Sequence, residues 1–156
     1  MSEGGAPKDW PHLAGRLEDR RHVLPVRVYY EDTDFSGLVY HASYLRFMER
    51  GRSDMIRLMG VHHSALAADE GARLVFVVRR MEIDFLRPAR IDDILEIVTE
   101  PAERTAAALT LAQAVTRNGE TLVRARVQIV LVDETGRPRR LASVLPDSAA
   151  AWTRPV

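Results

Sequence analysis

The chain has 156 residues, enough for one domain with a single hydrophobic core and too few for a second independent core. Its 22 basic and 22 acidic residues cancel to a formal net charge of zero, so no overall basic field favours nucleic acid or an anionic membrane as a partner. The absence of cysteine excludes disulfides, thiolate metal sites and a cysteine nucleophile.

Residues 1–22 are polar and show no sustained hydrophobic period, so we expect a flexible N-terminal extension. They contain no apolar stretch suited to a signal peptide. No apolar run in the chain reaches the roughly 18 residues of a membrane span. We therefore expect a cytoplasmic protein without a membrane span.

The predicted domain covers residues 23–134 and begins with a half-buried strand, in which Val26, Val28 and Tyr30 alternate with polar or exposed positions. Residues 31–37 have the composition of a turn. Apolar residues and one glycine then recur at spacings of three and four, which predicts an amphipathic helix of about four turns: Tyr44, Phe47, Met48, Gly51, Met55, Leu58 and Met59. Gly60 is expected to end this helix.

Four further strands are predicted, at residues 74–86, 94–100, 105–116 and 121–133. Asn118 and Gly119 indicate a tight hairpin between the last two. The first of the four is expected to place these side chains on one face: Val75, Val77, Met81, Ile83 and Phe85. This order predicts an α+β fold in which a curved, antiparallel, five-stranded sheet wraps one long helix. Residues 135–156 form a C-terminal extension, in which Pro146 and Asp147 could start a short helix.

The segment of residues 29–44 carries the candidate chemistry, because Asp34 stands just before the predicted helix. Unpaired backbone N–H groups and the positive end of the helix dipole converge at such a point. The N–H groups of Tyr40 or His41 could bind the oxyanion that forms when a carbonyl is attacked. A facing carboxylate can act as general base or as nucleophile, and a thioester suits it because thiolate is a good leaving group. By residue type alone, Asp32 and Asp34 also fit turn formers and helix caps.

Several segments together resemble the hotdog-fold thioesterases of the 4-hydroxybenzoyl-CoA thioesterase type, and more narrowly the branch encoded beside the bacterial Tol-Pal envelope system. The resemblance runs from about residue 23 to 132 and is carried by Tyr30-Glu31-Asp32-Thr33-Asp34, Gly37-Leu38-Val39-Tyr40-His41-Ala42-Ser43-Tyr44, Glu49, Arg52, Phe76-Val77-Val78-Arg79-Arg80-Met81 and Pro88-Ala89-Arg90-Ile91-Asp92-Asp93.

The resemblance implies a hotdog fold and a thioesterase acting on an acyl-CoA or acyl carrier protein thioester, without a cofactor or metal. It implies that Asp34 is the catalytic carboxylate and that the His41 backbone N–H polarises the carbonyl, with its imidazole assisting. It implies that Gly37 and Tyr40 form the turn that substrate approaches. It also implies a homodimer or homotetramer with active sites at subunit interfaces.

One departure from the family pattern follows the catalytic position. Much of this branch has Ala-Gly there, whereas this chain has Phe35-Ser36. The phenyl ring is expected to shorten the acyl pocket or to raise the pKa of Asp34 by desolvation.

Two other classes of site fit some of the same residues. Asp32 and Asp34 also fit a haloacid dehalogenase-type phosphatase, which needs a downstream lysine, whereas Lys8 is the only lysine. His41 with Glu49 could serve a dehydratase of the same fold, although Glu49 fits an ion partner of Arg52 or Arg46 more simply.

The remaining candidates are a histidine pair and several arginines. His62 and His63 lack a partner at helical spacing for a metal site. Arg79 is expected on the apolar side of its strand, where it needs a partner or ligand, and we assign it to substrate binding. A basic cluster suits either coenzyme A phosphates or solvent: Arg137, Arg139 and Arg140.

A rival from another class is a non-catalytic hotdog protein, a partner of an envelope or lipid-synthesis complex that uses only its surface. Turnover of thioesters discriminates it from the enzyme.

Overall fold

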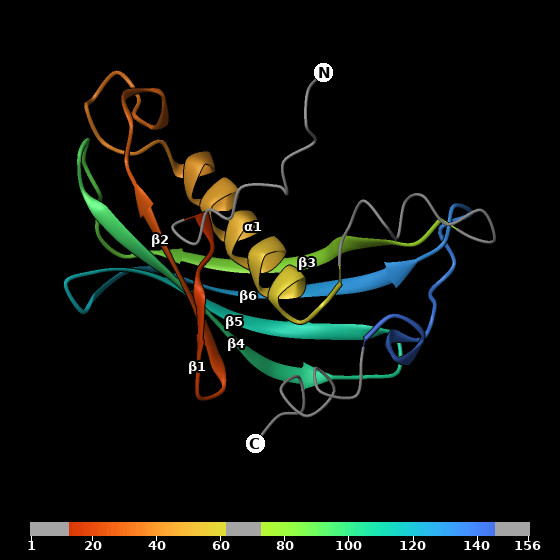
Figure 1. The fold of residues 1–156 in the computed structure, drawn as a ribbon. Coiled ribbons are helices and arrows are strands. Elements are labelled where there is room, and N and C mark those ends of the chain that lie inside the picture. The colour runs from red at the N-terminus through yellow and green to blue at the C-terminus, as the bar shows by residue number, and fades with distance from the viewer. Residues whose placement is uncertain (1–12, 62–72, 146–156) are drawn as a thin grey trace, which may run out of the picture.

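The computed structural model describes residues 13–61 and 73–145, in which one long helix lies across a six-stranded sheet (Figure 1). The helix α1 spans His41–Leu58. The strands are β1 Arg16–Glu18, β2 Arg21–Arg27, β3 Val75–Phe85, β4 Ile94–Arg104, β5 Ala108–Arg117 and β6 Glu120–Val132, with short 3₁₀ helices at Tyr30–Asp32 and Leu141–Ser143. The sheet order is β1-β2-β4-β5-β6-β3, and all neighbours are antiparallel. The predicted α+β architecture is confirmed, with six strands instead of five.

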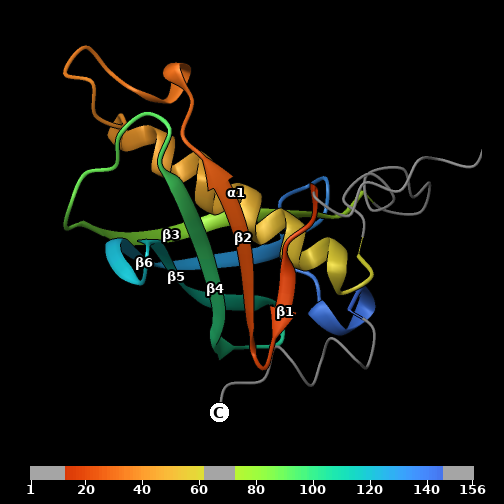
Figure 2. The same cartoon turned by 60° about the vertical axis from the view of Figure 1, so that its left-hand side comes forward.

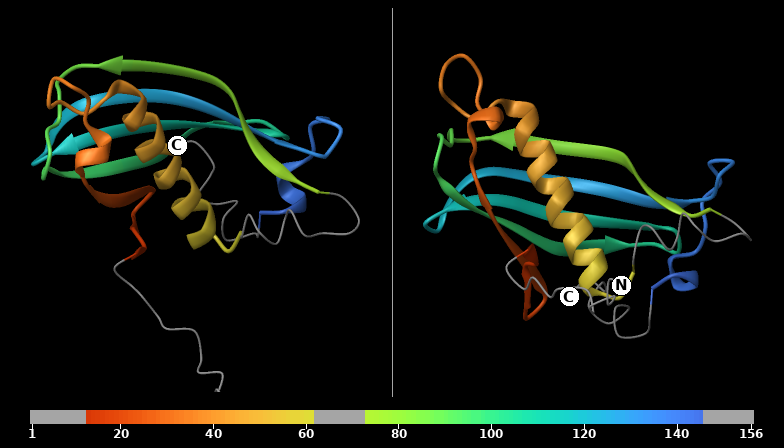
Figure 3. Two further views of the ribbon diagram at one scale, coloured as in Figure 1. Left: turned by 90° about the horizontal axis from the view of Figure 1, so that it is seen from above. Right: turned by 45° about the horizontal axis from the view of Figure 1, so that its top comes forward.

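Seen from above, the sheet arches over α1, so the helix buries its apolar face on the concave side (Figure 3). Residues of that face are fully enclosed: Tyr44, Phe47, Met48 and Met55 are at most 3% exposed. Leu58 departs from the prediction, because it lies in the last turn and is 39% exposed. The helix ends where predicted, since Gly60 adopts φ +91°. No helix within the described residues is long and apolar enough to cross a bilayer.

Gly51 marks the closest approach of α1 to the sheet. A Cβ added there would meet Ile97 Cγ2 at 2.8 Å and Thr99 Oγ1 at 3.4 Å. Ile97 is fully buried and its branched methyl group cannot swing aside. A side chain at this position therefore does not fit unless α1 or β4 shifts.

We expect Gly51→Val to destabilise the protein by about 1–3 kcal/mol, because the new side chain overpacks the interface between α1 and β4. Urea denaturation at constant protein concentration measures the loss. Ser53→Val, also in α1 but only partly buried, serves as the control. A Gly51→Val variant as stable as the parent would contradict the packing argument.

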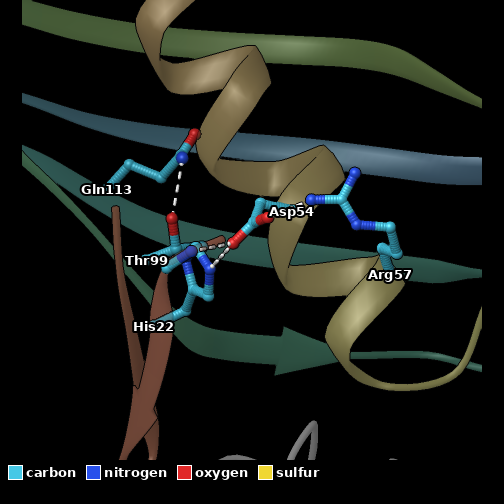
Figure 4. A network of polar contacts seen from close by, with 6 residues as sticks. His22, Asp54, Arg57, Thr99 and Gln113 are labelled. Carbon is cyan, nitrogen blue, oxygen red and sulfur yellow. Dashed lines mark hydrogen bonds and ion pairs between the residues drawn. The ribbon is translucent and has the colours of Figure 1, made fainter. Parts of the chain in front are cut away.

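Buried polar groups also anchor α1, and they hold the N-terminal hairpin to it (Figure 4). Asp54 on α1 receives the His22 Nε2 at 2.7 Å and the Gly15 backbone N–H at 2.7 Å, and it also pairs with Arg57. His22 is fully buried, and burial lowers its pKa, which favours the neutral imidazole. Its Nε2 must carry the proton, because a carboxylate can only accept.

A second buried group joins α1 to β4 and β5. Gln113 accepts a hydrogen bond from Arg52 at 3.0 Å and donates to the Met48 carbonyl at 3.0 Å and to Thr99 Oγ1 at 2.9 Å. The amide therefore has partners for both its oxygen and its nitrogen, as buried polar groups require.

The predicted extensions both contribute to this fold in their described parts. β1 and the first residues of β2 lie within the segment predicted as a flexible extension, and they form the hairpin at one edge of the sheet (Figure 2). At the other end of the chain, Leu141 and Leu145 enter the core. Pro146 and Asp147, and the helix predicted there, lie outside the described residues.

Some strand limits also differ from the predictions. β2 ends at Arg27, and Tyr30 is 83% exposed in a 3₁₀ helix instead of lying on a strand. β4 continues to Arg104, past a register shift between Pro101 and Glu103, so β5 starts later than expected.

The predicted face of β3 is wrong in its first half because a β-bulge interrupts the alternation. The register to β6 shifts between Val78 and Arg80, which leaves Arg79 as the extra residue. Phe76 therefore shares the core side with Met81 and Ile83, which all contact the core cluster. Val75 and Val77 lie on the other side and are 41% and 39% exposed.

Candidate active site

A tight turn between β2 and α1 presents Asp34. Its backbone N–H donates to the Leu38 carbonyl at 2.9 Å, and its carbonyl accepts from Gly37 N–H at 3.0 Å. Thr33 and Val39 form a β-bridge across the turn. Gly37 has φ +81°, a conformation that glycine adopts without strain. The carboxylate of Asp34 is thereby held at the exposed tip of a closed loop.

The two aspartates of the turn have different roles. Asp32 is 4% exposed and its carboxylate accepts the Tyr29 N–H at 2.8 Å. Its carbonyl accepts the Tyr40 N–H at 2.9 Å and the Ser43 hydroxyl at 3.1 Å. Asp32 therefore ties the loop to the start of α1, whereas Asp34 remains available for chemistry.

The start of α1 offers one of the two backbone donors that the sequence led us to expect. Tyr40 N–H is used by Asp32, which removes one of the two predicted oxyanion donors. Within the described residues, the N–H groups of His41 and Ala42 make no hydrogen bond. These groups stand at the positive end of an 18-residue helix. His41 thus remains the predicted donor.

A cavity of about 410 Å³ joins Asp34 to the start of α1. Residues from the turn, α1 and the end of β3 line it: Asp34, Leu38, Val39, His41, Tyr44, Phe85, Leu86, Arg87 and Pro88. The imidazole of His41 faces the ring of Phe85 edge-on, with centroids 6.1 Å apart. The buried Tyr44 hydroxyl accepts the Ala89 N–H at 2.8 Å and fixes the loop after β3. An apolar cavity with one acid and backbone donors suits attack on a carbonyl.

The Asp34 carboxylate is ionised and held from one side. The hydroxyl and the backbone N–H of Ser36 both donate to Oδ1, the latter at 2.8 Å, and they lower the pKa of Asp34 below its ordinary value. The expected effect of Phe35 is not found in the single chain, because its ring is fully exposed and the pKa is lowered instead of raised. The cavity wall contains no atom of Phe35.

The other predicted site residues are only partly brought together. Gly37 shapes the turn, and the Tyr40 ring lies 4.5 Å from that of His41, but neither residue lines the cavity. Arg79 is exposed at the bulge in the middle of β3, whereas the cavity lies at the end of that strand. The chain does not place Arg79 at the site.

Apart from Asp34 and His41 themselves, the residues of the alternative sites lie outside the Asp34 cavity or outside the described residues. Glu49 accepts a hydrogen bond from Ser53 at 2.6 Å and, in the described residues, forms no ion pair with Arg46 or Arg52. It lies outside the cavity that contains His41, which disfavours the dehydratase. The loop with Arg137–Arg140 lies at the opposite end of the sheet from the Asp34 turn (Figures 1 and 3). His62, His63 and Lys8 lie outside the described residues.

The cavity wall formed by the last residue of β3 and the segment after it was not predicted from the sequence. Phe85, Leu86, Arg87 and Pro88 are more than forty residues from Asp34, and only the sheet topology brings them near. Pro88 at a strand end marked a turn, but nothing local indicated which turn it would face. Arg87 also pairs with Glu120 at 3.0 Å.

A second cavity, of about 390 Å³, opens on the sheet away from this site. Its floor includes Ala112 and Ala114, and its charges include the pair of Arg124 with Asp84 at 3.2 Å. Among the described residues that line it, none belongs to the start of a helix. The Asp34 cavity, by contrast, combines a carboxylate with the start of α1, and this combination favours it as the site.

Comparisons with known proteins place the chain among thioesterases. The profile of the thioesterase-like superfamily matches residues 28–153. The acyl-CoA thioester hydrolase YbgC of Escherichia coli is 45% identical over 119 residues, 75% of this chain and 87% of that protein. The acyl-CoA thioesterase YbgC of Haemophilus influenzae is 40% identical over 115 residues, 74% and 83% of the two chains. The crystal structure of a probable thioesterase from Bartonella henselae has a TM-score of 0.75 and 48% identity, covering 78% of this chain and 98% of that one.

Proposed function

Because the chain belongs to the thioesterase-like superfamily, we propose that it is an acyl-CoA thioester hydrolase in which Asp34 is the general base or nucleophile. One observation carries the assignment of Asp34. An ionised carboxylate with a free oxygen and a helix start with unbonded N–H groups border the same cavity.

The proposed reaction places the thioester carbonyl oxygen at the His41 N–H and the carbonyl carbon in front of Asp34. Acting as a base, Asp34 takes a proton from water while the water oxygen bonds to the carbonyl carbon. The C–S bond then breaks, and the leaving thiolate takes the proton from Asp34, which gives a carboxylic acid, a free thiol and the ionised Asp34 again. Each backbone donor to the oxyanion typically contributes about 3–4 kcal/mol.

As a nucleophile, Asp34 would instead expel the thiolate and form a mixed anhydride, which water then hydrolyses. A single turnover in ¹⁸O-labelled water tests the anhydride route. Label in the Asp34 side chain after turnover indicates an anhydride that water opened at the side-chain carbonyl. An anhydride opened at the acyl carbonyl labels only the acid product, as direct attack by water does, and is recognised instead by trapping the acyl-enzyme with hydroxylamine.

The purified protein is expected to release free thiol from short-chain or aromatic acyl-CoA, measured with a thiol-reactive dye. A parallel series with acyl carrier protein thioesters tests the second predicted substrate class. No turnover across the panel, together with a co-purifying protein that Asp34→Ala still binds, would favour the non-catalytic alternative.

The active form is at least a homodimer. β3 is an 11-residue edge strand, and its side chains Val75, Val77 and Val78 are 39–48% exposed. Long exposed edges of this kind are normally covered. Phe85 and Leu86, at the end of the same strand, form the wall of the cavity and are also about half exposed. A second copy along β3 would therefore close the open side of the site.

Light scattering is expected to give a mass of at least twice 17.6 kDa and to decide between dimer and tetramer. Val77→Lys should weaken the association and lower kcat/KM together. Leu17→Lys at the opposite edge, where the side chain is 42% exposed, is the matched control and should leave both unchanged. A fully active monomer at micromolar concentration would refute the shared site.

A cytoplasmic location and a link to the Tol-Pal system stay predictions. Cell fractionation tests the location, and co-purification with the envelope proteins tests the link.

A further inference from the structure

The turn that carries Asp34 also contains Ser36, whose side chain bonds to the Asp34 carboxylate. The Ser36 hydroxyl donates to Asp34 Oδ1, and the Ser36 backbone N–H donates to the same oxygen at 2.8 Å. Within the described residues, no hydrogen bond reaches Oδ2 of Asp34. One oxygen of the carboxylate is therefore occupied and the other is free.

We propose that Ser36 is a positioning residue, which holds Asp34 by one carboxylate oxygen so that the other faces the thioester. This inference rests on the proposed function of Asp34. It adds a residue whose hydroxyl acts on the carboxylate and does not itself touch the substrate.

The hydroxyl is oriented from behind by the backbone. Leu38 N–H points at Ser36 Oγ, at 3.4 Å, so the oxygen accepts from one side while its proton goes to Asp34. The turn beneath is closed by the bonds between Asp34 and Leu38 and between Gly37 and Asp34. The closed turn therefore fixes the position of the Ser36 hydroxyl, and the hydroxyl in turn orients the Asp34 carboxylate.

A packing role for Ser36 is disfavoured by its surroundings. The residue is exposed, and in the part of the chain that the structure describes its hydroxyl is bonded only within this turn. Removing it leaves the Ser36 backbone N–H bond to Asp34 and the closed turn in place. The loss would thus fall on the orientation and charge of one carboxylate rather than on folding.

Removing the Ser36 hydroxyl is expected to shift the acid limb of the activity to higher pH. The Ser36 donors favour the ionised carboxylate and lower the pKa of Asp34. Activity requires the ionised form and is lost as the pH falls through that pKa. Without the hydroxyl the pKa rises towards its ordinary value, so activity is lost at higher pH.

The test compares Ser36→Ala with Ser36→Thr, which keeps a hydroxyl, in the full-length protein. With an acyl-CoA substrate, Ser36→Ala should lower kcat about tenfold and leave KM nearly unchanged, because a hydrogen bond to a charged group is lost. Its acid limb should move to higher pH. Ser36→Thr should restore both kcat and the pH profile. Unchanged kcat and pH profile in Ser36→Ala, or equal impairment of the two variants, would overturn the proposal.

A second readout does not depend on turnover. NMR titration of the Asp34 carboxyl should show a higher pKa in Ser36→Ala than in the parent and in Ser36→Thr. An unchanged titration also overturns the proposal. If Asp34→Asn is inactive while Ser36→Ala behaves as the parent, the inference about Ser36 fails alone. If Asp34→Asn is fully active, the proposed function fails.

Discussion

Asp34→Asn is expected to reduce kcat/KM for an acyl-CoA thioester by about 10³-fold or more, because it removes the base or nucleophile of the reaction. The amide has nearly the same shape but cannot accept a proton at neutral pH or form the anhydride. The helix start would still polarise the carbonyl, so a small residual rate is expected. Thiol release followed with a dye measures the effect.

The fold should survive this substitution, because Asp34 is exposed and, among the described residues, its side chain bonds only to Ser36. Circular dichroism and the melting temperature check this. Glu31→Gln is the matched control: it removes an exposed negative charge from the same loop, outside the cavity, and should retain activity. An Asp34→Asn variant with more than about a tenth of the parental kcat/KM would rule out Asp34 as the central group.

Asp54→Ala is expected to give the largest loss of stability, about 2–4 kcal/mol, because it leaves the buried Nε2–H of His22 and the part-buried Gly15 N–H without an acceptor. His22 is fully buried and would lose the bond of its Nε2, and Gly15 N–H would lose its acceptor. The substitution would therefore remove the polar link between the β1–β2 hairpin and α1 at His22 and Asp54 (Figure 4). Urea denaturation at fixed protein concentration measures the difference.

Arg57→Ala is the control, because it removes only the exposed ion-pair partner of Asp54. Its side chain is 50% exposed, so its loss should cost about 1 kcal/mol or less. Asp54 lies outside the cavity, and Asp54→Ala should keep its kcat at temperatures where it remains folded. Equal costs for the two substitutions would show that the buried pair of His22 and Asp54 contributes little.

Elements with a local cause were predicted well. The spacing of apolar residues defines one face of α1, and Gly60 supplies the left-handed residue that ends it. Asn118 and Gly119 both have positive φ, at +50° and +81°, as a two-residue hairpin demands. In each case the deciding interactions join residues at most four positions apart, so they can be read from the chain directly.

Elements with a distant cause were missed or placed wrongly. The bulge at Arg79 arises from pairing with β6, about fifty residues later, and it reverses the predicted face of β3. β1 is short and polar, and it is a strand because β2 pairs with it while Asp54 binds the neighbouring Gly15 and His22. No local pattern of hydrophobicity records such partners.

The site divides in the same way. The sequence alone determined that a carboxylate stands beside the start of a helix, because Asp34 and His41 are seven residues apart across one turn. Only the tertiary structure decided that Asp32 is buried, that Tyr40 N–H is already bonded, and that the end of β3 completes the cavity. The physical reason is that burial and hydrogen-bond partners depend on the segments that a sheet brings alongside, whereas turn and helix starts depend on neighbours in the chain.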